Sequence, residues 1–119
     1  MSSPFTTITT VIPSGTALSP EINLGDWELE AIITPSAWTT AALTFLGTTA
    51  SGGTDVNLFE DAGNEISIAC AVDRYISITG TDRTAIRSVR WLTIRSGTSG
   101  TPVNQGADRT LTLVLRKGL

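Results

Sequence analysis

Short segments in which apolar and polar residues alternate recur along this chain, with glycine, proline and serine residues between them. Alternation with a period of two is typical of a strand that buries one face, and Gly, Pro, Asn and Ser mark turns. The clearest segments are 27–34, 66–73 and 110–116. Threonine, a β-branched residue that favours strands, occurs 20 times. The chain is therefore predicted to be all-β.

About eight short strands are expected, and we predict that they form an antiparallel β-sandwich of jelly-roll type. The apolar faces of two four-stranded sheets would form the layer between them. A helix of no more than one turn, capped by Asp82, is expected within 81–88. The segment 89–95 would be a strand that is either buried on both faces or bulged. The residues expected to face the core are Trp27, Leu29, Ala31, Ile33, Ile66, Ile68, Cys70, Val72, Leu111, Leu113 and Leu115.

With 119 residues, of which 40% are hydrophobic, the chain has the size and composition of one folded domain. We expect a single domain over residues 1–119, with 1–13 as an N-terminal arm or an edge strand. This segment has no charged residue and alternates Thr with Ile and Val. As an arm it would add a strand to a neighbouring sheet and bury Phe5, Ile8 and Ile12 there.

Residue types that are absent or rare exclude several classes of function. The chain has no His, so it cannot form a Ser-His-Asp or Cys-His pair or a His-ligated metal site. Its single cysteine, Cys70, has no His or cluster of cations to activate it. The 8 Lys and Arg against 11 Asp and Glu give a formal net charge of −3. This balance argues against a nucleic-acid or anionic-membrane partner.

Carboxylates are the remaining candidates for catalysis. Glu28 and Glu30 are two residues apart on a predicted strand and would share a face, as the carboxylates of a glycosidase do. A solvated sheet face explains the same spacing. The Asp and Asn residues within 55–64 lack the spacing of a calcium loop and fit a turn. We therefore expect no catalytic residue, no metal and no cofactor.

Arginine and tryptophan side chains are the candidates for binding a partner. Seven of the 8 basic residues are Arg, which is enriched at protein interfaces where Lys is depleted. The basic candidates are Arg74, Arg87 and Arg90. Trp38, within 35–40, is the tryptophan expected to be exposed, where it would stack on a sugar or close one end of the sandwich.

Two segments carry a characteristic series of loops and strands. Residues 35–68, PSAWTTAALTFLGTTASGGTDVNLFEDAGNEISI, contain a Trp loop, a Ser/Gly/Thr turn and an Asp-Xaa-Gly hairpin. Residues 89–116, VRWLTIRSGTSGTPVNQGADRTLTLVLR, place a long loop before the last strand. Together these segments, more than half of the chain, resemble a group of small virion-associated proteins of tailed bacteriophages and prophages.

The resemblance implies a structural protein with the β-sandwich form of capsid-decorating, head-fibre and tail-attachment modules. We expect a capsid decoration or cement protein that binds the major capsid protein or another virion structural protein. It would be a homo-oligomer, with a trimer favoured, on the capsid surface of a virion assembled in the host cytoplasm. The alternative is a carbohydrate-binding or host-adhesion module of a head or tail fibre, with Trp38 and the loop 96–107 as its site.

Overall fold

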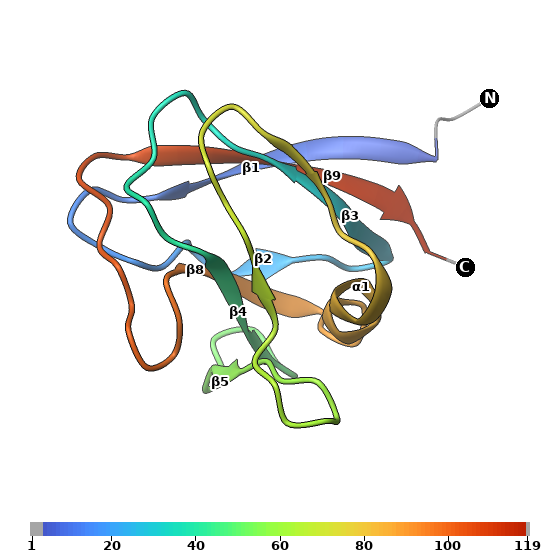
Figure 1. The fold of residues 1–119 in the computed structure, drawn as a ribbon. Helices are drawn as coiled ribbons and strands as arrows, with labels where there is room; N and C mark the ends of the chain where they lie inside the picture. The colour runs from blue at the N-terminus through green and yellow to red at the C-terminus, as the bar shows by residue number, and fades with distance from the viewer. Residues whose placement is uncertain (1–3, 119) are drawn as a thin grey trace.

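The computed structural model describes residues 4–118, which form two antiparallel β-sheets packed face to face (Figure 1). Residues 1–3 and 119 lie outside the described part. The predicted N-terminal arm 1–13 is therefore compared with the structure over residues 4–13, and the predicted domain 1–119 over residues 4–118. The elements in chain order are β1 Phe5–Ile12, β2 Ile22–Asn23, β3 Trp27–Ile33, β4 Leu43–Thr48, β5 Val56–Asn57, β6 Ser67–Ile68, β7 Tyr75–Ser77, α1 Gly80–Ile86, β8 Trp91–Ser96 and β9 Arg109–Lys117.

The order of the strands is that of a jelly roll. Sheet A has the order β1-β9-β3-β7, and sheet B has the order β2-β8-β4-β5, with β6 also paired to β4. All of these pairings are antiparallel. The late strands β8 and β9 return between the early strands, β8 between β2 and β4 and β9 between β1 and β3. The predicted antiparallel jelly-roll sandwich is confirmed, although sheet B has five strands instead of four.

The hydrophobic core fills the layer between the two sheets. Leu111, Leu113 and Leu115 of β9 face this layer, as predicted, and are at most 3% exposed. Removing these side chains from water is the main favourable contribution that holds the sheets together. The other large buried members of the core include Ile12, Leu29, Ile32, Leu43, Phe45, Ile66, Ile78, Ile86, Leu92 and Ile94.

Residues 5–12 form an edge strand of the domain's own sheet. β1 pairs with β9 along its whole length without a break, beginning with Phe5 opposite Arg116. Because side chains alternate along a strand, Ile8 and Ile12 face the core, where Ile12 is fully buried, and Phe5 lies on the outer face. An arm that buries these three side chains together in a neighbour is therefore contradicted. The alternation separates them, and the domain's own core takes up Ile12.

A β-bulge at Glu30 changes the facing of β3. The register of β3 against β9 shifts between Leu29 and Ala31, so Glu30 is an extra residue on this strand. Beyond the bulge the two faces exchange, and Ile32 is fully buried in the core. The prediction that Ala31 and Ile33 face the layer between the sheets is wrong, because a bulge shifts every later side chain to the other face. Ala31 is nevertheless buried, at 1% exposure.

The segment 66–73 is mostly irregular, although its alternation is the most regular in the sequence. Only two of its residues, those of β6, pair with β4. Ile66 and Ile68 are buried as predicted, whereas Val72 is exposed. The chain turns at Asp73, whose φ is 54°, so β7 is a separate strand in the other sheet.

The helix α1 lies at one side of the sandwich, next to the start of β3 (Figure 1). It has seven residues, about two turns, and is longer than the single turn predicted within 81–88. Its N-cap is Thr79, and Asp82 lies in its first turn. Ile86 is fully buried and anchors the helix to the core. Among residues 4–118, no helix is long and apolar enough to cross a membrane.

Candidate interaction surface

The outer face of sheet A is uncharged over most of its area. The strand register aligns Thr7, Val114, Ala31 and Ser77 in one row across the four strands. We call the following outward-facing residues the uncharged face: Phe5, Thr7, Thr9, Val11, Ala31, Ile33, Tyr75, Ser77, Thr110, Thr112 and Val114.

Two aromatic side chains are exposed on the uncharged face, whereas Ala31 and Val114 at its centre are buried. Phe5 on β1 is 45% exposed, and the Arg116 guanidinium lies 5.8 Å from the centre of its ring. Tyr75 on β7 is 65% exposed, and Ile33, opposite Tyr75, is half-buried. The outward face of an antiparallel sheet commonly carries polar residues. Uncharged exposed surface with aromatic side chains is typical of the centre of a protein–protein contact. This face is therefore the candidate interaction surface of the chain.

A group of ion pairs lies at one end of the uncharged face, where α1 meets β3. Arg83 Nη2 lies 2.9 Å from Glu30 Oε2, and Arg87 Nε lies 3.3 Å from Glu28 Oε1. Arg83 Nη1 also donates a hydrogen bond of 3.2 Å to Glu30 Oε1. These contacts hold the helix against the bulge in β3. Glu28 and Glu30 are thus paired with arginines, which gives them a structural role.

A basic hollow opens beside these ion pairs, with a volume of about 790 Å³. Half of the chain's 8 Lys and Arg residues line it, together with a single carboxylate. Arg83 and Arg87 are paired with Glu30 and Glu28, and Lys117 Nζ lies 3.8 Å from Asp26 Oδ2, so three carboxylates offset most of the positive charge of these four cations. Arginine forks suit carboxylate groups on a partner. The lining residues are Pro4, Glu28, Arg83, Arg87, Arg116, Lys117 and Gly118.

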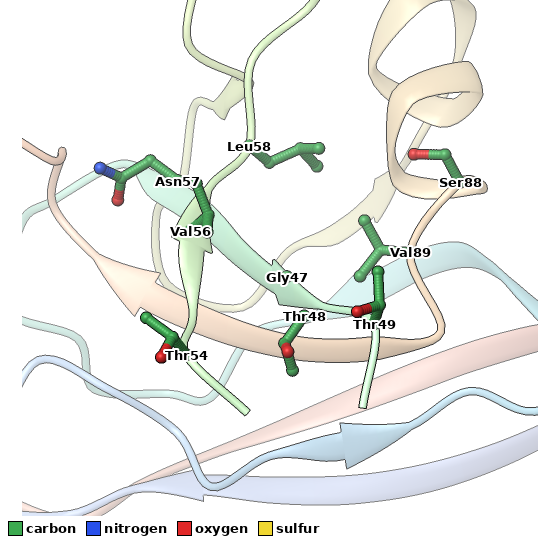
Figure 2. A pocket seen from close by; sticks show the side chains of 9 residues that line it. All are labelled: Gly47, Thr48, Thr49, Thr54, Val56, Asn57, Leu58, Ser88 and Val89. Atoms are coloured by element: carbon green, nitrogen blue, oxygen red, sulfur yellow. The ribbon is translucent and has the colours of Figure 1, made fainter. Parts of the chain in front are cut away.

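A smaller pocket of about 330 Å³ lies where β4 and β5 meet the turn after α1 (Figure 2). Its lining consists of hydroxyl, amide and aliphatic groups, none of which titrates near neutral pH, so it offers no general acid or base. A Cβ on Gly47 would lie 2.8 Å from Val89 Cγ1, so glycine permits this close approach. The lining residues are Gly47, Thr48, Thr49, Thr54, Val56, Asn57, Leu58, Ser88 and Val89.

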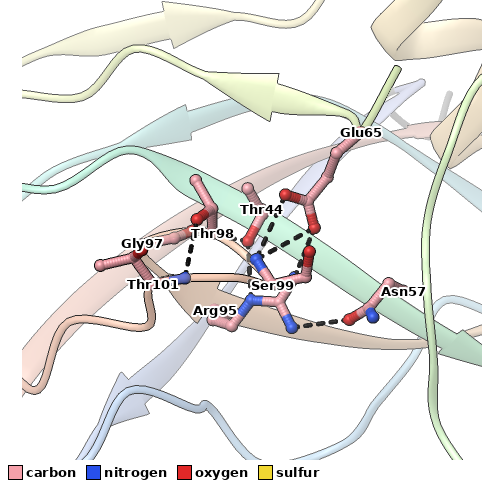
Figure 3. Close-up of polar contacts among 8 residues, drawn as sticks. All are labelled: Thr44, Asn57, Glu65, Arg95, Gly97, Thr98, Ser99 and Thr101. Carbon is pink, nitrogen blue, oxygen red and sulfur yellow. Dashed lines mark hydrogen bonds and ion pairs between the residues drawn. The ribbon is translucent and has the colours of Figure 1, made fainter. Parts of the chain in front are cut away.

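Arg95 is buried on the outer face of sheet B, where it joins two strands and two loops (Figure 3). Its Nε donates to Thr44 Oγ1 at 2.9 Å, and its Nη1 donates to Asn57 Oδ1 at 2.7 Å. Its Nη2 lies 2.8 Å from Glu65 Oε2, and Glu65 also accepts the N–H of Ser99. β8 is therefore buried on both faces, one of the two alternatives predicted, and Arg95 serves the fold.

The residues predicted to bind a partner do not form a single site. Phe5 belongs to the uncharged face, and Arg87 lines the basic hollow. Arg74 is exposed next to β7. Arg90 belongs to the other sheet's side of the molecule, where its guanidinium lies 5.4 Å from the centre of the Trp91 ring. The structure thus brings Phe5 and Arg87 to the same side and leaves Arg90 away from them.

Trp38 closes one end of the core. Its ring is 9% exposed, and its Nε1 donates to Ala41 O at 3.1 Å. Gln105 holds this loop, because its Oε1 accepts the N–H of Thr39 at 2.8 Å and its Nε2 donates to Thr39 O at 3.0 Å. A buried ring cannot stack on a sugar. The prediction of a sugar-stacking site at Trp38 and the loop 96–107 is therefore wrong. The other predicted role of Trp38, to close one end of the sandwich, agrees with its burial in the core.

Groups with metal-binding or nucleophilic chemistry are few in the described residues. Within 4–118, no three or more Cys, Asp or Glu side chains gather as metal ligands would. Cys70 is half-buried, and burial raises the pKa of its thiol to about 11, while the nearby Arg74 lowers it to a smaller extent. The thiol is protonated at neutral pH and is a weak nucleophile.

Comparisons with known proteins support the fold. No protein-family model matches the chain, and no curated protein sequence matches it. The crystal structure of the SPBc2 prophage-derived protein YomS is similar to this structure, with a TM-score of 0.54 and 11% sequence identity. The alignment covers 97% of this chain and 96% of that chain. The likeness therefore extends over nearly the whole of both chains, and it shows that they share a fold.

Proposed function

We propose that this chain is a structural protein of a bacteriophage particle, and specifically a decoration protein that binds the outer surface of the head. The observation that carries the proposal is the uncharged face, with Phe5 and Tyr75 exposed on its two edge strands. The centres of protein interfaces are depleted of charge and enriched in aromatic residues. The likeness to a prophage-derived protein supports a phage origin.

The proposed mechanism is binding without catalysis. The carboxylates Glu28 and Glu30 are neutralised by arginines, and the Cys70 thiol is held in its neutral form by burial. A protein that binds only the assembled capsid lattice stabilises that lattice by mass action. The partner would be the major capsid protein or another virion structural protein, and the location would be the capsid surface.

The two parts of the surface would contribute differently to binding. The uncharged face would supply apolar contact area, which is the main source of affinity. Arg116, which lines the basic hollow, would pair with an acidic side chain of the partner and help to fix the orientation of the complex. A lattice protein with an acidic segment beside an apolar patch would match this arrangement.

A pair of matched substitutions tests the proposal. Tyr75 is 65% exposed on the uncharged face, and Val56 is 66% exposed on sheet B. The purified full chain should bind phage heads that lack it, and Y75D should weaken this binding by at least about tenfold because it introduces a charge at the interface. V56D adds the same charge at equal exposure and should bind like the unmodified chain.

Two outcomes would refute the proposal. If the unmodified chain does not bind heads produced without its gene, it is not a decoration protein of that particle. If Y75D and V56D bind equally well, the uncharged face is not the contact surface. Thermal unfolding of both variants checks that each is folded, since both positions are exposed.

A further inference from the structure

The β1 edge of sheet A is long and uninterrupted. Its residues, Phe5–Ile12, include no charged residue and no proline, and their register against β9 has no bulge. Pro4 and Pro13 bound the strand at its two ends. Natural proteins protect exposed edges with charges, prolines, bulges or very short strands. In the described residues, the other edge strands, β2, β5, β6 and β7, have only two or three residues each.

One set of β1 backbone groups points away from the protein. The N–H of Lys117 donates to Pro4 O at 2.8 Å, which shows that Pro4 belongs to the residues that bond to β9. Alternate residues of an antiparallel strand bond to the same neighbour, so Thr7, Thr9 and Val11 direct their N–H and C=O groups outward. Within residues 4–118, no other strand or loop bonds to these groups.

We propose that a second copy of this chain occupies this edge. The two β1 strands pair in antiparallel fashion around a two-fold axis that passes through Ile8. Thr7 of each copy then lies opposite Thr9 of the other copy, and both pairs exchange backbone hydrogen bonds. The four strands of sheet A and those of the second copy form one continuous sheet.

The side chains of β1 are self-complementary in this register. On the outer face, Phe5 lies opposite Val11 of the second copy. On the inner face, Thr6 lies opposite Thr10, and Ile8 lies opposite its own counterpart. Pairs of an aromatic with a β-branched residue and pairs of threonines stabilise antiparallel sheets. Ile8 already packs against the core, so the contact between the two Ile8 side chains extends the core layer from one copy to the other.

Other registers fit less well. An axis between Ile8 and Thr9 would place core-facing residues opposite outward-facing ones, which the sheet geometry forbids. An axis through Thr9 would place Phe5 opposite Pro13, which has no N–H to donate. Pairing of β1 with the short edge β7 of another copy would cover three residues only. The matching occupant for the full length of β1 is therefore β1 of a second copy.

The charges of the chain are compatible with this dimer. Arg116, on β9, is the neighbour of Phe5, and Lys117 follows it. Antiparallel pairing puts the Phe5 end of one copy beside the Val11 end of the other. The Arg116 side chains of the two copies are then separated by six residues, or about 20 Å along the strands. This exceeds the Debye length of about 8 Å at physiological ionic strength, so they do not repel strongly.

This inference concerns contact between copies and is separate from attachment to a particle. The dimer would display two uncharged faces side by side, which would double the surface offered to a lattice. A two-fold assembly of this kind also differs from the trimer that the sequence resemblance implies. The symmetry of the oligomer in solution therefore tests the inference whether or not the chain binds phage heads.

The test uses the full chain and charged variants of the exposed edge. Light scattering coupled to size-exclusion chromatography should report a dimer for the unmodified chain. T7K/T9K places lysines opposite each other across the axis and should raise the dimer dissociation constant by more than about tenfold. T7E/T9E alone should raise the dimer dissociation constant by a similar factor. An equimolar mixture of the two variants should form a heterodimer, because opposite charges then face each other.

A matched control separates the edge from the face. Y75K/S77K puts the same two charges, also two residues apart, on exposed positions of β7, the opposite edge strand of sheet A, and should dimerise like the unmodified chain. Amide hydrogen exchange at Thr7 and Thr9 should slow as the protein concentration rises. A monomer at all concentrations, a trimer, or a mixture of the two charged variants that stays monomeric would each overturn the proposal.

Discussion

Glu65 and Arg95 form an ion pair of 2.8 Å on the outer face of sheet B, with side chains that are 15% and 6% exposed. The pair joins β8 to the hairpin that follows β5, and the hydrogen bonds of Arg95 to Thr44 and Asn57 add β4 and β5 to the same group. One guanidinium thus fixes elements that are far apart in the sequence. It explains why a buried strand carries an arginine.

Replacing Arg95 with Met should lower the free energy of unfolding by about 3–5 kcal/mol, because Glu65 would keep a largely buried charge without a cation. Urea denaturation measures the change. E65Q retains an acceptor for Arg95 and should destabilise the protein less, and the double variant should lose less than the sum of the single losses. An R95M protein that unfolds at the unmodified urea midpoint would contradict this account.

Gly97 should not tolerate alanine. Its φ is 92°, and a Cβ there would lie 2.5 Å from Thr101 O and 2.6 Å from Val103 N. G97A should therefore destabilise the protein by at least about 1–3 kcal/mol, seen as a lower Tm. G100A is the matched control, since no atom lies within 4 Å of a Cβ at Gly100. Equal Tm values for the two variants would show that the turn adapts.

Trp38 should contribute to stability and not to sugar binding. Truncation to Ala removes a large side chain from the end of the core and should lower the free energy of unfolding by about 3–5 kcal/mol. W38F keeps much of the volume but loses the hydrogen bond to Ala41 O, and its loss should be smaller. Denaturant unfolding compares the two variants. A W38A protein with unchanged stability would refute the closing role.

Cys70 should react slowly with alkylating reagents. Burial raises the pKa of its thiol from 9.0 to about 11, and Arg74 opposes this shift only in part. Alkylation of the folded chain should stay slow at pH 8 and accelerate towards pH 11, whereas the chain unfolded in urea should react as a thiol of pKa near 9.0 does. A folded thiol that reacts as fast as the unfolded one would contradict its burial.

The same shift predicts how stability depends on pH. Because the folded pKa lies above the unfolded one, the stabilisation from the neutral thiol is fully present below pH 9.0 and is lost as the pH rises through about 11. The C70S variant lacks this titration and is the control. Its stability should fall less than that of the unmodified chain over this pH range, as measured by urea unfolding.

Local patterns determined most of the strand assignment. The strand predicted over 27–34 agrees with β3 except for one residue at its end, and the leucines of β9 face the core as their alternation predicted. Turn chemistry in 60–64 correctly predicted the hairpin, in which the N–H of Glu60 donates to Asn64 O at 2.9 Å. These features depend on residues that are close in the chain, so the sequence carries them directly.

The candidate surface depended on contacts between distant residues. The uncharged face exists because four strands from both ends of the chain align in one register, and the bulge at Glu30 turns Ala31 and Ile33 outward to complete it. Periodicity in a single strand contains no information on an inserted residue, which is set by the neighbouring strand and by Arg83, which pairs with Glu30.

By itself, the sequence determined that the chain is a β-sandwich, since alternation and turn residues are properties of composition and local order. Only the tertiary structure decided which arginine is buried, that Trp38 closes the core, and that β1 is an open edge. Each of these depends on which segments become neighbours. Burial and hydrogen-bond satisfaction are decided by those neighbours, and they are fixed only when the two sheets pack.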